Sequence, residues 1–217
     1  MKVLTFLFVI LFFSVSAFPQ VAVMADMSGS PSSDRTKSWS TSKVNVRVGI
    51  TKDLSATVLI RTSSYNREAT NPNAPSDAGL VGLFYRLDPT IRFGGAVGLQ
   101  TRYLQKKEIG WVASGDLFFG VVNQKNYYFR KQAFGYVHIE KGQWDKQFYV
   151  DARAMFPLID FFALGGKFES DLGFGPHVEI KIPLADEERM KAIYLYGTYF
   201  TEKEIKTSVL GIRVAIN

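Results

Sequence analysis

The chain has 217 residues, of which 14% are aromatic and 21% are charged, and its formal net charge is +6. It contains no cysteine, which excludes disulfides, thiolate chemistry and cysteine-rich metal sites. A chain of this length forms one domain with room for a sizeable core or a closed barrel. The modest basic excess suits anionic solutes or lipid phosphates. Because no basic run or stacking motif accompanies it, we expect no nucleic-acid partner.

The N-terminal segment 1–17 has the pattern of a secretory signal peptide. Lys2 supplies a positive start, Val3 to Phe13 form an apolar run, and Val15-Ser16-Ala17 is a small-residue cleavage motif. The run is shorter than the roughly twenty residues that cross a bilayer as a helix. We therefore predict export with cleavage after Ala17, and a cut after Ala25 is the alternative.

Beyond the signal peptide, we expect segment 18–42 to be an N-terminal strand or mobile arm and segment 43–217 to be a β-barrel domain. From Lys43 onward, apolar side chains occupy one parity of most segments and polar or charged side chains the other, although segment 190–200 gives no assignment of its faces. Successive side chains of a strand point to opposite faces, so each such segment predicts a strand with one apolar face. The predicted strands are 43–51, 55–65, 78–87, 91–105, 109–122, 127–140, 146–157, 161–169, 172–183, 190–200 and 205–217.

Segment 91–105 shows this alternation most clearly. Val97 and Leu99 share the apolar parity, whereas Arg92 and Gln100 share the charged one. The segment is far longer than the usual strand of about five or six residues. Small residues on the charged face, where a crowded interior needs them, are Gly94, Ala96 and Gly98.

Long strands joined by tight turns predict an all-β protein, a transmembrane antiparallel up-and-down β-barrel. Lipid offers the backbone no hydrogen bonds, so strands can cross it only as a closed sheet. Each crossing needs about nine to eleven tilted residues, and single-chain bacterial barrels have an even number of strands. We therefore predict about twelve strands, with Val21 to Met27 as the twelfth. Ten is the alternative, in which 161–169 is a folded-in loop.

Two turns, Gly49-Ile50-Thr51-Lys52-Asp53-Leu54 and Tyr85-Arg86-Leu87-Asp88-Pro89-Thr90, are similar to periplasmic turns of small outer-membrane β-barrel proteins of Gram-negative bacteria. This resemblance covers about Lys43 to Asn217 and is one of class, without a diagnostic motif. It implies location in the bacterial outer membrane, contact with membrane lipid and lipopolysaccharide, and insertion by the outer-membrane assembly machinery. The chain departs from the class at Ala215-Ile216-Asn217, where such proteins commonly end on an aromatic residue.

The polar parity carries more bases than acids. If it faces the lumen, the surplus favours a narrow, porin-like channel, because rings of Arg or Lys raise the local concentration of anions. The alternative is an ion-pair network that braces the wall as a structural envelope component, since buried charge must be paired. The predicted anion-contacting residues are Arg47, Arg61, Arg92, Arg102, Arg130, Arg153, Lys181 and Arg213. The predicted acidic partners in the lumen are Asp116, Glu140, Asp151 and Glu179.

The sequence contains two histidines, His138 and His177, each two residues from a glutamate on the same face. With Ser114 and Asp116 they offer an alternative function, an enzyme that hydrolyses lipid or peptide. A polar lumen residue beside a carboxylate is the simpler interpretation, so we assign no catalytic residue. No metal-ligand spacing is present, and we expect neither a metal nor a cofactor. A soluble periplasmic barrel that binds an apolar ligand is a further alternative.

Overall fold

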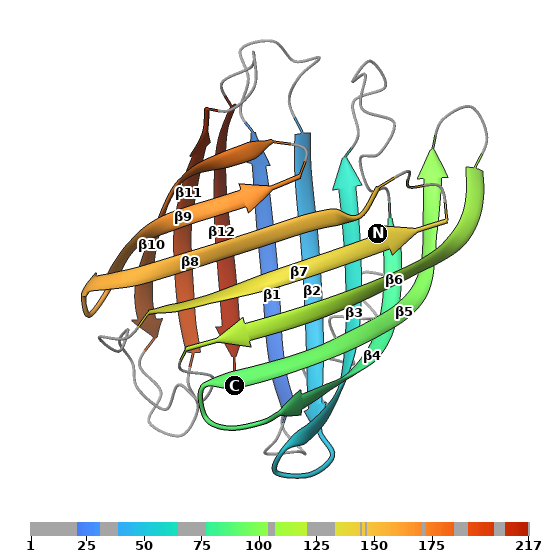
Figure 1. Ribbon diagram of the computed structural model, residues 1–217, viewed down its shortest axis with the longest axis horizontal. Helices are drawn as coiled ribbons and strands as arrows, with labels where there is room; N and C mark the ends of the chain where they lie inside the picture. Colours follow the sequence, from blue (N-terminus) through green and yellow to red (C-terminus); the bar gives the residue numbers. More distant parts are fainter. Residues whose placement is uncertain are drawn as a thin grey trace.

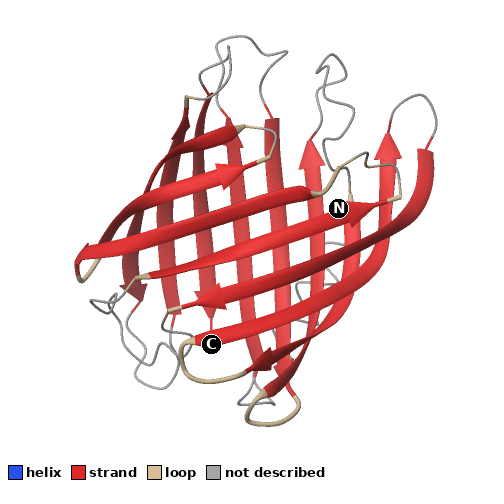
Figure 2. Cartoon of the chain, in the orientation of Figure 1, coloured by secondary structure: helices blue, strands red, loops and turns tan. Residues whose placement is uncertain are grey.

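The computed structural model describes residues 21–30, 39–64, 77–103, 107–120, 133–143, 145, 147–170, 172–184, 191–201 and 207–216. These residues form a closed barrel in which every strand runs antiparallel to both of its neighbours (Figure 1). Consecutive strands pair along the sequence, and the first strand pairs with the last. The described residues include no helix, and so none that is long and apolar enough to cross a membrane (Figure 2).

The strands are β1 Val21–Ser30, β2 Trp39–Gly49, β3 Leu54–Ser64, β4 Ala78–Arg86, β5 Ile91–Tyr103, β6 Lys107–Phe119, β7 Phe134–Gly142, β8 Tyr149–Ile159, β9 Phe162–Glu169, β10 Gly173–Leu184, β11 Lys191–Phe200 and β12 Thr207–Ile216. The predicted antiparallel up-and-down barrel of twelve strands is confirmed. The ten-strand alternative is wrong, because β9 pairs with both β8 and β10 as a full member of the wall.

The barrel takes in more of the N-terminal region than segment 43–217. Within the stretch expected to be a strand or a mobile arm, residues 21–30 form β1 and residues 39–42 belong to β2. These residues are rich in serine and show little of the apolar alternation that marks the other strands. Pairing with both neighbours outweighs that weak strand preference, because propensity in a sheet depends mainly on context.

β1 closes the barrel by pairing along both of its edges. It pairs with β2 from Val21 opposite Val48 to Ser30 opposite Trp39. On its other side it pairs with β12 from Val23 opposite Ile216 to Gly29 opposite Leu210. A closed sheet has no free edge, so no strand of this wall is left with a row of unpaired backbone groups.

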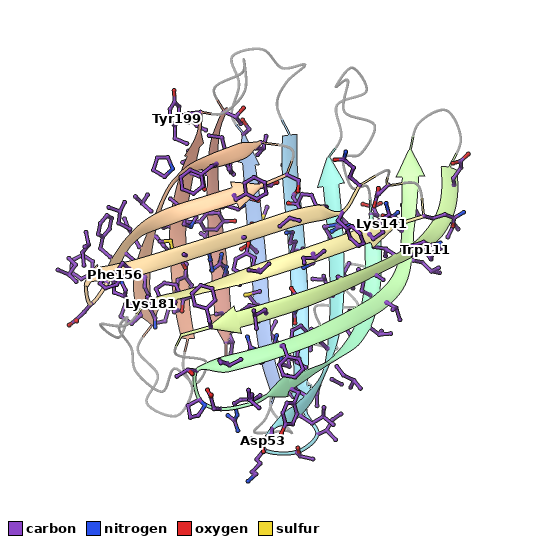
Figure 3. The ribbon with its side chains drawn as sticks, viewed as in Figure 1. Asp53, Trp111, Lys141, Phe156, Lys181 and Tyr199 are labelled. Carbon is purple, nitrogen blue, oxygen red and sulfur yellow. The ribbon has the colours of Figure 1, made fainter. Side chains whose placement is uncertain are left out.

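The outer face of the barrel is apolar and the inner face is polar. Val97 is 62% exposed and Leu99 is 61% exposed, whereas Gln100 is only 5% exposed, as the alternation of segment 91–105 predicts. Phe156 projects from the outer face in the same way (Figure 3). Among the described side chains of the strands, the only charged one on the outward parity is Lys141, the next-to-last residue of β7. The wall therefore presents almost no charge to its surroundings.

Two tight turns join strands at one end of the barrel, the lower end in Figure 1, which we call the turn end. In the turn between β2 and β3, the backbone N–H groups of Ile50 and Thr51 both donate to the Leu54 carbonyl. In the turn between β4 and β5, the Asp88 carboxylate accepts hydrogen bonds from the Thr90 hydroxyl and backbone N–H. These bonds hold the pKa of Asp88 below its usual value.

The closure by β1 generates a prediction about maturation. Segment 1–17 lies outside the described residues, but a cut after Ala25 would remove the half of β1 that pairs with Val44, Val46 and Val48. We expect cleavage after Ala17, so the intact mass of the mature protein should correspond to a chain that starts at Phe18. A mature chain that starts at Asp26 would contradict this expectation, because β1 would then be too short to seal the wall.

Candidate functional site

The interior of the barrel holds most of the charged side chains predicted for it. The inward-facing bases are Lys43, Arg47, Arg61, Arg86, Arg92, Arg153, Lys167, Lys181 and Arg213. The inward-facing acids are Asp26, Asp116, Glu140, Asp151, Glu169 and Glu179, with Glu108 exposed on the same parity at the start of β6. The side chain of Arg102 and the whole of Arg130 lie outside the described residues. The described surplus is thus two positive charges, smaller than the alternation alone indicated.

A first chain of contacts links β3, β6 and β7. Arg61 forms a bidentate ion pair with Glu140, in which Nη1 and Nη2 lie 2.6 and 2.8 Å from the two carboxylate oxygens. His138 lies between two acids, with Nδ1 2.8 Å from Asp116 and Nε2 3.5 Å from Glu140. These side chains are buried or nearly so. The pairing ties together strands that are far apart in the sequence.

A second group of contacts crosses the closure of the barrel. Arg213 of β12 contacts Asp26 of β1 at 2.8 Å and Glu179 of β10 at 3.1 Å. The other carboxylate oxygen of Glu179 lies 3.1 Å from Nη1 of Arg153 on β8. The Tyr196 hydroxyl donates to Asp26 at 2.5 Å. Sequence reasoning missed Asp26, since its strand has no clear alternation to mark which residues face inward.

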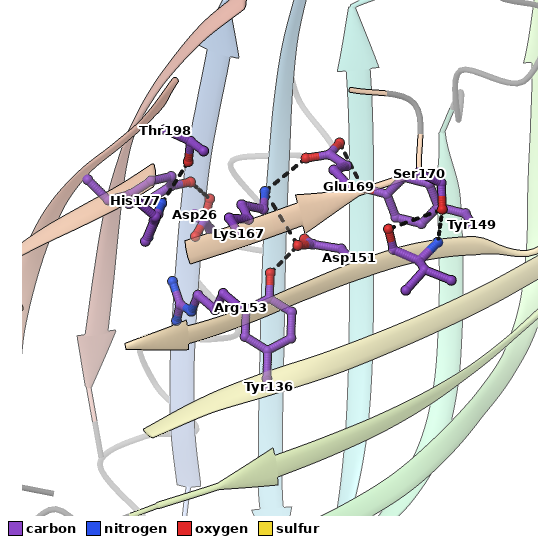
Figure 4. A network of polar contacts seen from close by, with 12 residues as sticks. Asp26, Tyr136, Tyr149, Asp151, Arg153, Lys167, Glu169, Ser170, His177 and Thr198 are labelled. Atoms are coloured by element: carbon purple, nitrogen blue, oxygen red, sulfur yellow. Dashed lines mark hydrogen bonds and ion pairs between the residues drawn. The ribbon is translucent and has the colours of Figure 1, made fainter. Parts of the chain in front are cut away.

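A third group surrounds Lys167 on β9, as Figure 4 shows. The Lys167 ammonium lies 2.9 Å from Glu169 and 3.4 Å from Asp151. The Tyr136 hydroxyl donates to Asp151 at 2.6 Å, and the Tyr149 hydroxyl donates to Glu169 at 2.9 Å. One base, two acids and two phenols thus contact one another inside the wall through ion pairs and hydrogen bonds.

Apolar side chains fill further parts of the interior. Leu80, Met155, Phe200 and Val209 all lie on inward-facing parities and are almost completely buried. A side chain with so little exposure is in contact with protein on all sides, so water does not occupy the space around it. Where these residues lie, the interior is a packed core and not an aqueous passage.

Two arginines depart from the pattern of paired charge. Arg47 of β2 stacks on Phe84, with its guanidinium carbon 4.6 Å from the ring centroid. Arg92 of β5 stacks on Phe118 at 4.4 Å and lies 5.9 Å from the Phe84 centroid. No described carboxylate lies within 4 Å of either guanidinium. Gly94 makes room for this arrangement, because a Cβ atom there would lie 2.6 Å from the Phe84 ring.

The histidines do not form the nucleophile-and-base pair of a hydrolase. Both ring nitrogens of His138 point toward carboxylates, so neither is available to the hydroxyl of Ser114. His177 contacts the Thr198 hydroxyl through Nδ1 at 2.6 Å, and both residues are buried in the interior. These contacts are typical of structural histidines. Among the described residues there is also no cluster of three His, Asp or Glu side chains placed to hold a metal ion.

The pairing of Glu179 with two arginines leads to a stability prediction. The Glu179→Gln variant should lower the free energy of unfolding by about 3–5 kcal/mol, because Arg153 loses its described acidic partner and Arg213 keeps only Asp26. The measurement is denaturant-induced unfolding from lipid vesicles. Glu108→Gln is the matched control, since Glu108 is exposed at the start of β6. Equal stability of the two variants would show that the interior ion pairs do not brace the wall.

Comparisons with known proteins add a structural likeness. No family model and no curated protein matches the sequence. Among solved structures, the barrel is similar to the outer membrane phospholipase A from Escherichia coli, with a TM-score of 0.44 and 11% sequence identity. The likeness covers 91% of this chain and 92% of that chain.

Proposed function

We propose that the protein is an integral barrel of the bacterial outer membrane and that it serves as a structural component of the envelope. The observation that carries this proposal is the reversed distribution of polarity, with apolar side chains outside and charges inside. A soluble barrel would place its charges outside and its apolar side chains in the core. An outer face of exposed valine, leucine, isoleucine and phenylalanine matches the acyl chains of a bilayer instead. The same exterior argues against a soluble periplasmic barrel.

Aromatic side chains near both ends of the barrel support the membrane assignment. Tyr85 and Phe93 face outward near the turn end, with ring centroids 5.8 Å apart. Trp111 and Tyr199 are also exposed on the outer face, toward the opposite end (Figure 3). Tyrosine and tryptophan favour the headgroup level of a bilayer, because one part of the ring is apolar and another makes hydrogen bonds.

The filled interior favours a structural role over that of a wide porin. Three groups of ion pairs and hydrogen bonds connect β1, β3 and β6–β12 across the barrel, and apolar side chains fill further parts of the interior. Buried charges that pair with one another stiffen the wall, but their opposite signs cancel, so they exert little electrostatic attraction on a solute ion. Bracing is therefore the function that most of the described interior performs.

A narrow anion channel is the second candidate, and the specific observation that favours it is the Arg47–Arg92 pair. These two bases lack described acidic partners, and the interior as a whole has a surplus of two positive charges. Fixed positive charge in a passage lowers the energy of an anion within about a Debye length, roughly 8 Å at physiological salt.

The membrane assignment is tested by charge placed at two depths of the same outer face. Val97→Arg, at the middle of β5, should destabilise the folded barrel in lipid vesicles by roughly 2–4 kcal/mol. Leu87→Arg, in the turn between β4 and β5, should cost less than about 1 kcal/mol because the side chain reaches the headgroups and water. The measurement is reversible unfolding from vesicles in urea. Similar costs at both positions would contradict a bilayer around the strands.

Conductance separates the structural role from the channel. A braced, filled barrel should give no steady current in a planar bilayer beyond that of the bare membrane. A selective current in the wild type, with a reversal potential that changes sign in the Arg47→Glu, Arg92→Glu double variant, would establish the anion channel and exclude the purely structural role. Boiled and unboiled samples of a folded barrel migrate differently on a denaturing gel, and this gel shift serves as the check that both proteins are folded.

A further inference from the structure

We propose that Arg47 and Arg92 form a binding site for a phosphate-type anion inside the barrel, near its turn end. Arg47 lies two residues before the end of β2, and Arg92 is the second residue of β5. Phe84 and Phe118, on β4 and β6, lie at the same level because Phe84 pairs with Gly94 and Phe118 pairs with Arg92. The site thus combines two bases and two aromatic rings from four strands.

The charge of this site is not neutralised by the described residues. Asp116 is the nearest interior acid by register, since it lies opposite Gly94, but its carboxylate is bonded to His138. Arg86, directly opposite Arg92 in the sheet, adds positive charge and is itself bonded to the Lys52 carbonyl and to Asp53. Arg47 and Arg92 are half-buried, and a guanidinium that is withdrawn from water is normally paired, because an unpaired charge in the interior is costly. An anion between Arg47 and Arg92 would offset this cost.

The arginines are held ready for a ligand. Each stacks on a phenylalanine, an arrangement that supports the guanidinium through its flat face and leaves its edge for hydrogen bonds. The Nε atoms of Arg47 and Arg92 are buried and have no hydrogen-bond partner among the described residues, and unlike Arg61 and Arg153, whose Nε atoms are in the same state, these two arginines also lack a described acidic partner. These edge groups are the donors that a bound oxyanion would use.

Solvent reaches the space beside the site. Met24 lies on the inward parity of β1, opposite Asn45 of β2, whose side-chain oxygen accepts a hydrogen bond from Thr57. Despite facing inward, Met24 is 36% exposed, in contrast to the packed side chains elsewhere in the interior. Arg47 of β2 lies opposite Ala22, which is two residues before Met24 on β1. Met24 and Arg47 therefore border the same part of the lumen. A small anion therefore has room to approach.

The chemistry of the site points to phosphate rather than to a monovalent halide. A guanidinium presents parallel N–H donors that match two oxygens of a phosphate group, and two guanidinium groups match its charge as well. The phosphate could belong to a soluble ion or to a lipid headgroup, and both carry the same oxyanion. The inference concerns binding alone and holds whether or not the barrel conducts ions.

The test is calorimetric titration of the folded protein with inorganic phosphate, in a maltoside detergent that carries no phosphate of its own. A parallel titration uses mixed micelles that contain phosphatidate, to distinguish a soluble phosphate from a headgroup. The variants are Arg47→Gln and Arg92→Gln, with Arg92→Lys to keep the charge without the paired donors. Lys52→Gln is the matched control, since it removes one positive charge from an exposed position at the same end of the barrel.

We expect saturable binding that either glutamine variant weakens by about tenfold or more, because each removes a charged hydrogen-bond donor. Arg92→Lys should weaken it less, and Lys52→Gln should leave it unchanged. Binding of inorganic phosphate assigns a soluble ligand, and binding of phosphatidate alone assigns a headgroup. The proposal is overturned if neither probe binds, or if Lys52→Gln reduces binding as much as the arginine variants do. A glutamine variant that fails the gel-shift check for folding is replaced by its lysine counterpart, for which unchanged affinity would also overturn the proposal.

Discussion

The antiparallel pairing of β1 with β12 is the constraint on which the rest of the structure depends. Without it the sheet would have two open edges and no distinct inside. With it, Asp26 lies opposite Arg213, and the closure gains an ion pair as well as backbone hydrogen bonds. Because the register alternates, this one pairing also determines that every second residue of β1 and β12 faces the interior. The first and last strands are thereby joined by backbone hydrogen bonds and by an ion pair.

Closure of the barrel brings charged side chains together in its interior, where each charge needs a partner of opposite sign or a hydrogen bond. Among the described side chains of the strands, Lys141 is the only charged one on the outward parity, so the strands place their other described bases and acids together inside. Glu179 illustrates the result, because it receives arginines from β8 and β12 while its own strand is β10. Such contacts join strands that are not adjacent in the wall, and they resist flattening of the barrel. A braced interior and an apolar exterior are therefore two outcomes of the same alternation.

The described network of interior ion pairs does not extend to Arg47 and Arg92. Near the turn end, aromatic rings replace carboxylates as the partners of the bases, and Gly94 supplies the space for Phe84. A ring attracts a guanidinium more weakly than a carboxylate does, and it leaves the positive charge uncancelled. The interior thus changes along its length from paired charge to free positive charge. This change gives one end of the barrel a chemistry that the bracing network does not require.

By itself the sequence determined the strands, the turns and which face of most strands is apolar, because alternation with a period of two is a local property. It placed Val97 and Leu99 outside and Gln100 inside, as the structure has them. It did not reveal Asp26 as an interior acid, since β1 has apolar residues on both parities and therefore little alternation, and gains its role only from its two partners. Nor did it separate Arg47 and Arg92 from Arg153 and Arg213. All four arginines share a local pattern, and only the register and the barrel's curvature decide which of them meets a carboxylate and which meets a ring.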